Sequence, residues 1–347
     1  MPKRSTEPPT DISCGLTTNE FSELLRFLLD AAARNERAAL VTLTDVIGSS
    51  PRAPGTHMAV TESGDRFGSV SSGCFEAAVV AEALRCIESG HAEVIRFGRG
   101  SRFIDIQLPC GGGMDLLFTP VAGQEVLEQA LHRHEKRRAL ALALDREGSI
   151  SLVGEGEIPT GWRGDVFFAA HPPRLKLCIF GRGAEVWSLL RLALVSGADV
   201  CVGSPDQSLV EAVCSAGANA HQLRTGTDDL GFSLDPATAA ILLFHDHDWE
   251  LDLLEQLLRS PAFFIGAMGS RRTHALRVEG LRARGAEDAA IDRIVGPVGL
   301  IPCMRDPQTL ALSILAQVVA IYSARRLDDE ALEPATSRTA TLDAANI

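Results

Sequence analysis

The chain lacks the features of a membrane-spanning, secreted or nucleic-acid-binding protein. No apolar run approaches the ~20 residues that cross a bilayer, so we expect no integral membrane segment. The basic residues near the N-terminus are followed by no apolar stretch, which argues against a secretory signal. Lys and Arg number 33 against 45 Asp and Glu, and this net charge of −12 repels the phosphate backbone of nucleic acids.

The cysteine pattern also excludes two classes of small domain. The eight cysteines include no C-x-x-C pair and are spread over 347 residues. A disulfide framework or a zinc ribbon would need closer, regular spacing. We therefore expect reduced thiols and a cytoplasmic protein.

The length leaves room for two domains of ~150 residues each. Residues 1–18 are predicted to be a tail, and residues 19–170 form a mixed α+β domain. The two prolines of residues 171–173 mark a stiff linker. Strands and helices then alternate through residues 174–327, which predicts a Rossmann-like, doubly wound parallel sheet. The polar residues 328–347 are expected to be a flexible tail.

One glycine pair lies in the position of a dinucleotide fingerprint. Gly181 and Gly183 stand between a predicted buried strand and a predicted helix, where helix amides can meet a phosphate. The third glycine of that fingerprint is replaced by Val186, which would crowd the helix against the strand, and Ser204 stands near the expected acid. We therefore do not expect ordinary NAD(P) binding, and a turn that only joins strand to helix remains the alternative.

Two cysteines lie in glycine-flanked loops. Cys74 is expected at the N-terminus of a helix starting near Phe75, where the helix dipole favours a thiolate. Cys110 precedes three glycines that expose backbone amides. We favour a functional role for both over the alternative of small buried apolar residues. That alternative is our expectation for four other cysteines: Cys86, Cys178, Cys201 and Cys214.

Further loops offer cations and polar groups. Arg52 lies in a loop stiffened by two prolines and suits a phosphate or a carboxylate. His245 and Asp246 follow a predicted strand and either bind a ligand or cap the next helix. A third loop combines exposed amides with two guanidinium groups and is predicted to bind an oxyanion. Its residues are Gly269, Ser270, Arg271 and Arg272.

These segments in their order resemble the xanthine dehydrogenase accessory factor (XdhC/CoxI) family, from about Leu40 to Ala320. The resembling stretches are GSSPRAPG (48–55), GSVSSGCFEAAV (68–79), LPCGGGMDLL (108–117), LKLCIFGRGAEV (175–186), HDHDWELDLL (245–254), FIGAMGSRRTHALRVEGL (264–281), GPVGL (296–300) and DPQTLALSILAQVVA (306–320).

The resemblance implies a protein that binds the molybdenum cofactor (molybdopterin) as cargo. Family members protect it, support its sulfuration with a cysteine desulfurase and deliver it to an apo-form molybdenum hydroxylase. It further implies a maturation factor rather than a catalyst. On general grounds we expect a homodimer.

By position in the matching motifs, Cys74 and Cys110 are the expected molybdenum contacts. The other expected cofactor-binding residues are Arg52, Ser71, Gly73, Gly111, Gly112, Gly181, Gly183, Gly269, Ser270, Arg271, Arg272, His245 and Asp246. We expect the loops of both domains to meet in one cleft. The alternatives are an NAD(P)-dependent oxidoreductase and a non-catalytic adaptor between a desulfurase and an apo-hydroxylase.

Overall fold

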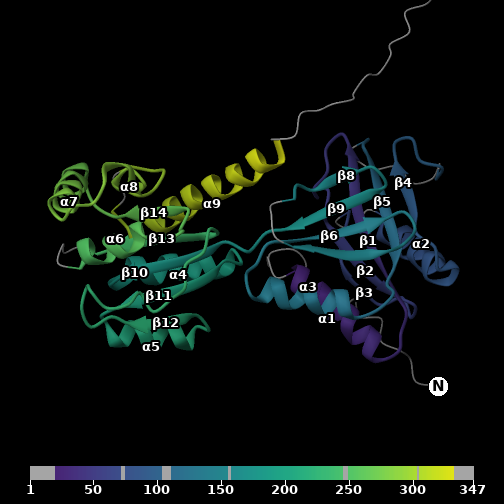
Figure 1. The fold of residues 1–347 in the computed structure, drawn as a ribbon, viewed down its shortest axis with the longest axis horizontal. Coiled ribbons are helices and arrows are strands. Elements are labelled where there is room, and N and C mark those ends of the chain that lie inside the picture. The colour runs from purple at the N-terminus through teal and green to yellow at the C-terminus, as the bar shows by residue number, and fades with distance from the viewer. Residues whose placement is uncertain are drawn as a thin grey trace, which may run out of the picture.

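The chain folds into two lobes that are joined by a short linker (Figure 1). The structure, a computed structural model, describes residues 20–71, 75–103, 111–154, 158–244, 249–302 and 305–331. The first lobe contains two antiparallel sheets, and the second contains one parallel sheet with helices on both faces. The predicted α+β domain followed by a Rossmann-like domain is thus confirmed.

The first sheet of the N-terminal lobe has the strand order β3-β2-β1-β5-β4. Its strands are β1 (Ala38–Ile47), β2 (His57–Thr61), β3 (Arg66–Gly68), β4 (Glu93–Gly98) and β5 (Gly113–Pro120). The central strand β1 is apolar on both sides, because Val41 and Leu43 pack toward helix α2 (Glu76–Ser89) while Leu40 packs toward helix α1 (Glu20–Ala33). Both faces of this sheet are therefore covered.

A second sheet completes the N-terminal lobe. It has the order β7-β6-β9-β8, from β6 (Leu140–Asp145), β7 (Ile150–Gly154), β8 (Gly161–Arg163) and β9 (Val166–His171). One apolar cluster unites Leu28 of α1, Leu127 of helix α3 (Glu125–Glu135) and Phe167 of β9 with the first sheet. The two sheets are thus packed together through α1 and α3.

The C-terminal lobe has the parallel strand order β12-β11-β10-β13-β14-β15. This is the Rossmann order, in which the chain reverses between β10 and β13. The strands are β10 (Lys176–Gly181), β11 (Asp199–Ser204), β12 (Asn219–Gln222), β13 (Thr238–Leu243), β14 (Phe264–Ala267) and β15 (Ile294–Val295). The sequence motifs do not predict β8, β12 or β15, which are short strands.

Helices cover both faces of the parallel sheet (Figure 1). On one face lie α4 (Gly183–Val195), α5 (Gln207–Ser215) and α9 (Pro307–Ala331). On the other lie α6 (Glu250–Leu258), α7 (Arg271–Ala283) and α8 (Asp288–Ile291). Val186 of α4 is fully buried in the first of these cores, so the branched side chain expected to crowd the helix is accommodated there by packing.

Helix α9 is the one segment in the described ranges with the length and composition of a membrane span, over Pro307–Arg325. The buried share of that segment is 28%. Its side chains Ile314, Leu315 and Val318 belong to the core beneath the parallel sheet. Packing on α4 therefore accounts for one apolar face of the helix.

Arg137 fixes how the two lobes meet. It follows α3 with a positive φ of 56° and extends into the C-terminal lobe. There it donates from Nε to Asp235 at 2.7 Å, from Nη2 to the Arg174 carbonyl at 2.8 Å and from Nη1 to Asp199. All three acceptors precede or begin strands of the parallel sheet, so the N-terminal lobe abuts the amino ends of those strands.

We expect Arg137→Ala to lower the free energy of unfolding by about 2 kcal/mol, because it leaves two partly buried carboxylates without their cation. Urea denaturation measures the loss, and faster proteolysis at the linker would report looser lobes. Arg138→Ala, at the exposed neighbouring position, is the matched control. Equal stability of the two variants would contradict a role for Arg137 at the junction.

Candidate functional site

Three loops of the N-terminal lobe meet at one edge of its first sheet. Strand β1 ends where Ile47 pairs with Gly113, at the start of β5. Strand β3 ends at Gly68, which pairs with Met58 near the start of β2, and β4 ends at Gly98, which pairs with Gly113. The loops 48–56, 69–75 and 99–112 therefore leave the same edge. A Cβ placed on Gly48 would lie 3.5 Å from the Gly112 Cα, so two of these loops touch.

A buried carboxylate holds the second loop. Glu76, the first residue of α2, is 7% exposed. Ser69 donates its hydroxyl to Glu76 Oε1 at 2.5 Å, and Ser71 donates its hydroxyl to Oε2 at 2.7 Å. The Ser71 amide adds a third bond at 3.3 Å. The sequence motifs do not single out Glu76, although an acid in the first turn of a helix is a recognisable signal.

An aromatic stack joins the second loop to the third. The Phe75 and Phe97 rings lie parallel with centroids 5.0 Å apart, and Phe103 stacks on the other side of Phe97 at 5.2 Å. Phe75 directly follows residues 72–74, and Phe103 directly precedes residues 104–110. The described ends of the two segments that carry the predicted cysteines are thus tied to one apolar cluster. Gly73, Cys74 and Cys110 themselves lie outside the described residues.

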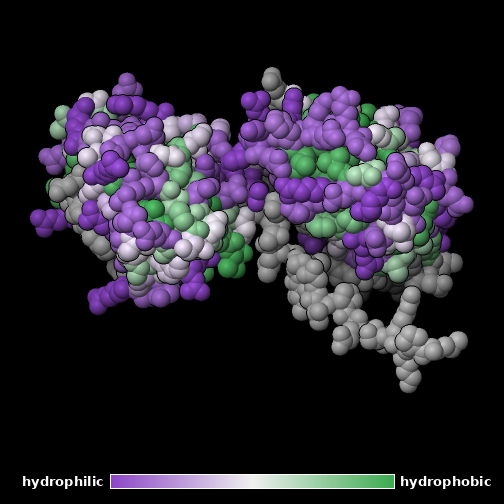
Figure 2. Space-filling view, turned by 90° about the horizontal axis from the view of Figure 1, so that it is seen from below, coloured by the Kyte–Doolittle hydropathy of each residue, from purple (hydrophilic) through white to green (hydrophobic). Residues whose placement is uncertain are grey.

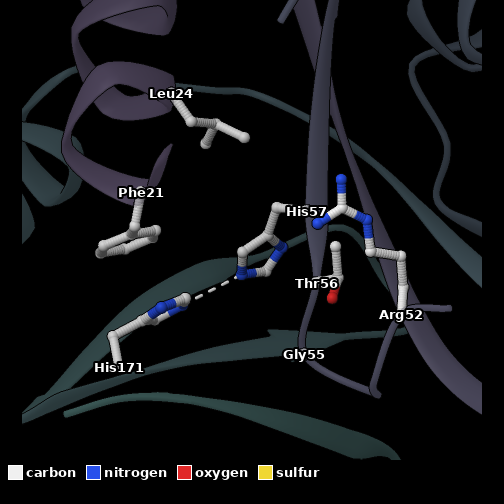
Figure 3. Close-up of a pocket in the computed structure, with 7 residues that line it drawn as sticks. All are labelled: Phe21, Leu24, Arg52, Gly55, Thr56, His57 and His171. Atoms are coloured by element: carbon white, nitrogen blue, oxygen red, sulfur yellow. Dashed lines mark hydrogen bonds between the residues drawn. The ribbon is translucent and has the colours of Figure 1, made fainter. Parts of the chain in front are cut away.

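Arg52, from the first loop, lines a cavity of about 160 Å³ (Figure 3). The other lining residues are Phe21, Leu24, Gly55, Thr56, His57 and His171. The cavity thus lies between α1, the loop 48–56 and the end of β9. The expectation that Arg52 belongs to a ligand-binding loop rather than to a solvated loop tip stays a prediction, and the cavity gives it a location.

Two histidines in this cavity are hydrogen-bonded to each other. The Nε2 atoms of His57 and His171 are 3.0 Å apart, and His57 Nδ1 lies 2.8 Å from the Thr42 hydroxyl. The Phe21 ring stacks on His171 with a centroid distance of 3.5 Å. Burial lowers the pKa of His57 to about 3. Neither histidine stands out in the sequence, because only folding brings β2 and β9 together.

The glycine turn of the C-terminal lobe has a structural explanation. A Cβ on Gly181 would overlap the Leu243 carbonyl oxygen of the adjacent strand, and Gly183 adopts a φ of 82°. Ser204, at the end of β11, is fully buried. The turn thus requires glycine with or without a phosphate, and the second strand ends without a surface acid for a ribose.

The predicted oxyanion loop opens helix α7. The Ser270 hydroxyl accepts the Thr273 amide at 3.1 Å and so caps the helix, while Arg271 and Arg272 are exposed. Gly269 precedes the cap with a φ of 141°. His245 and Asp246 lie outside the described residues. The described part of this loop therefore offers two exposed cations beside a capped helix start.

The expected single cleft is wrong for one chain. The turns at Gly181 and Gly269 follow the carboxyl ends of β10 and β14. The N-terminal lobe meets the amino ends of the same sheet, through Arg137. A strand of six residues spans about 20 Å, so the two sets of loops lie on opposite sides of the C-terminal lobe (Figure 1). The sequence could not reveal this, because the orientation depends on contacts between lobes.

The remaining cysteines divide into two kinds. Cys86, Cys178 and Cys201 are buried, as expected, and burial raises the pKa of Cys86 to about 11. Cys178 and Cys201 pair across β10 and β11, and the pKa of Cys178 is raised by its hydrogen bond with Cys201 and by burial. Cys214 is exposed, so the expectation of burial is wrong there, because it lies on the outer side of α5.

The fold and loops thus define a two-domain protein with an α+β lobe, a Rossmann lobe and a loop-built site on the first. A profile described as the XdhC and CoxI family matches residues 31–98, and one described as the XdhC Rossmann domain matches residues 177–318. The molybdenum cofactor insertion chaperone PaoD of Escherichia coli is 34% identical over 92% of this chain and 94% of its own length. The chain therefore belongs to the XdhC and CoxI family.

More distant relatives agree with this assignment. A protein of Bacillus subtilis named as a probable xanthine dehydrogenase component is 22% identical over 84% of this chain and 96% of its own length. A crystal structure described as a xanthine dehydrogenase from Bacillus halodurans superposes with a TM-score of 0.70 at 22% identity. It covers 91% of this chain and 98% of that one, which shows the shared two-lobe fold.

We expect Glu76→Gln to lower the free energy of unfolding by about 1–3 kcal/mol, because it turns a charged double acceptor into an amide and disrupts its bonds with Ser69 and Ser71. Hydrogen exchange at the Ser71 and Phe75 amides should quicken in the same variant. Glu88→Gln, at an exposed position of α2, is the control. Unchanged exchange in Glu76→Gln would show that the carboxylate does not order this loop.

We expect His57 to make the protein acid-sensitive. Its pKa of about 3 in the folded state lies below the ordinary 6.5, so only the unfolded chain gains this proton as the pH falls through that interval. The stabilisation is complete above pH 6.5 and is lost on acidification at up to about 1.4 kcal/mol per pH unit. Unfolding titrations of wild type and His57→Gln from pH 7 to about 4 test the assignment. Parallel curves would refute it, and His91→Gln, an exposed histidine, is the control.

Proposed function

We propose that this protein is a molybdenum cofactor chaperone that protects the cofactor, supports its sulfuration and delivers it to a molybdenum hydroxylase. The observation that carries the proposal is the near full-length similarity to a protein named as a molybdenum cofactor insertion chaperone. The edge of the first sheet supports it, because three loops with glycines, serines and an arginine leave that edge together.

The proposed cargo contacts lie in the N-terminal lobe. Cys74 and Cys110 are the proposed thiol contacts of the molybdenum, and the loops around them supply amides and hydroxyls. The supporting residues are Arg52, Ser71, Gly73, Gly111 and Gly112. Thiolates are suited to a soft metal centre, and amides and guanidinium groups are suited to the phosphate of the pterin. What this chain contributes is binding and exclusion of water rather than a catalytic step.

The Rossmann lobe is proposed as a separate docking or ligand surface. Gly181, Gly183, Gly269, Ser270, Arg271 and Arg272 remain candidates there, together with His245 and Asp246. NAD(P) is not the proposed ligand, since Val186 and Ser204 stand in place of the fingerprint glycine and acid. Calorimetry with NAD(H) and NADP(H) tests this point, and saturable binding lost in Gly183→Ala would favour the oxidoreductase alternative.

The proposed partners are an apo-form molybdenum hydroxylase and a cysteine desulfurase, in the cytoplasm. We also propose a homodimer, in which the Rossmann lobe of one copy can approach the cargo loops of the other. Light scattering should then give twice the chain mass of 37.1 kDa. Pull-down of both enzymes without any bound cofactor would favour the adaptor alternative instead.

We expect the Cys74→Ala/Cys110→Ala double variant to lose most of the molybdopterin that the wild-type protein retains after anaerobic purification. Fluorescence of the oxidised pterin measures the retained cofactor, and circular dichroism checks the fold. Cys214→Ala removes an exposed thiol on the other lobe and is the control. Full retention by the double variant would remove the thiols from the mechanism.

A further inference from the structure

The cavity beside Arg52 combines features of an anion site. It is lined by one guanidinium group and two imidazoles, and none of its seven lining residues is acidic. Its volume of about 160 Å³ is close to that of a protein cavity of ~150 Å³ that holds benzene, so a tetrahedral oxyanion fits. Figure 3 shows Arg52 on one side of His57 and His171 on the other.

The two imidazoles are arranged to share a proton. Their Nε2 atoms are 3.0 Å apart and their ring centroids 5.1 Å apart, so the rings meet nearly end to end. Two nitrogens bound to one tetrahedral zinc ion would stand about 3.3 Å apart and point at the metal rather than at each other. The geometry therefore favours one N–H between the rings, with one imidazole donating and the other accepting.

The same arrangement can take up one more proton without losing that bond. His57 can donate from Nδ1 to the Thr42 hydroxyl and accept at Nε2, which leaves His171 as the donor. Burial lowers the pKa of His57, so the incoming proton goes to Nδ1 of His171. The Phe21 ring, stacked on His171 with a centroid distance of 3.5 Å, favours the resulting imidazolium through its π face.

We propose that this cavity binds a phosphate-type oxyanion between Arg52 and the His57–His171 pair, and that binding is linked to uptake of one proton by the pair. With that proton the cavity holds two positive charges, which match a dianion. The proposal rests on the proposed function only for the source of the anion, which is either the phosphoryl end of the cargo or free phosphate.

Other charged groups near the pair do not supply the second charge. His134 of α3 meets the edge of Phe21 at a centroid distance of 5.3 Å, but its Nδ1 lies 2.6 Å from the Ser22 hydroxyl and burial lowers its pKa. From α1 the cavity receives only Phe21 and Leu24, and from β1 the pair receives the uncharged Thr42. The proton is thus assigned to the His57–His171 pair.

The test is calorimetric titration of the full chain, free of cofactor, with sulfate in phosphate-free buffer. Sulfate mimics a phosphoryl dianion and keeps its charge between about pH 5 and 8. We expect one site whose affinity rises about tenfold per pH unit of acidification, with close to one proton taken up per sulfate in buffers of different ionisation enthalpy. Equal affinity at all pH values without proton uptake would overturn the proposal.

Two variants make the assignment specific. Arg52→Gln should abolish sulfate binding, and His171→Gln should weaken it and remove the pH dependence, because glutamine keeps a polar group but takes no proton. His91→Gln, at an exposed histidine, should bind like wild type. Unchanged binding and pH dependence in folded His171→Gln, as judged by circular dichroism, would refute the role of the pair.

Retention of the pterin cofactor separates this proposal from the proposed function. Loss of retention in His171→Gln places the phosphoryl end of the cargo in the cavity, whereas retained cofactor with lost sulfate binding assigns the cavity to free phosphate. Absence of sulfate binding in a wild-type protein whose retention depends on Cys74 and Cys110 would overturn the cavity proposal and leave the chaperone function standing.

Discussion

The pairing of β1 with β5 is the constraint on which the candidate site depends. Because Ile47 lies opposite Gly113, the end of one strand and the start of the other meet at one edge, and the pairing of β4 with β5 brings a third chain segment there. A shift of one residue would turn every side chain of β1 to the opposite face, and both faces are buried. The cores on the two sides of the sheet therefore fix the place of the loops.

The contact of Arg137 with the C-terminal lobe sets a second constraint. By binding Asp199 and Asp235 it directs the N-terminal lobe to the amino ends of the parallel strands. The rim where Rossmann sheets bind ligands then faces away from the cargo loops. One chain thus presents two separated surfaces, which agrees better with a carrier that holds cargo on one lobe and meets other molecules with the second than with a single enclosed active site. The space-filling view likewise shows two separate bodies with a narrow junction between them (Figure 2).

Buried polar groups distinguish the proposed cargo region from an ordinary sheet edge. Glu76 collects three hydrogen bonds from Ser69 and Ser71 beside the segment that carries Cys74. His57 and His171 meet across two different sheets. Burying such groups costs free energy unless they are paired, and their pairing here orders the loop and the cavity wall next to it.

The sequence by itself determined the class of fold, the order of the two lobes and the family, because apolar periodicity and glycine-bounded motifs are local properties of the chain. It also indicated Arg52 and the cysteine-bearing loops as candidates. Only the tertiary structure decided that Glu76 organises one of those loops, that His57 meets His171, and that Gly181 lies far from Arg52. These outcomes depend on contacts between residues distant in the chain, and local periodicity carries no information about such contacts.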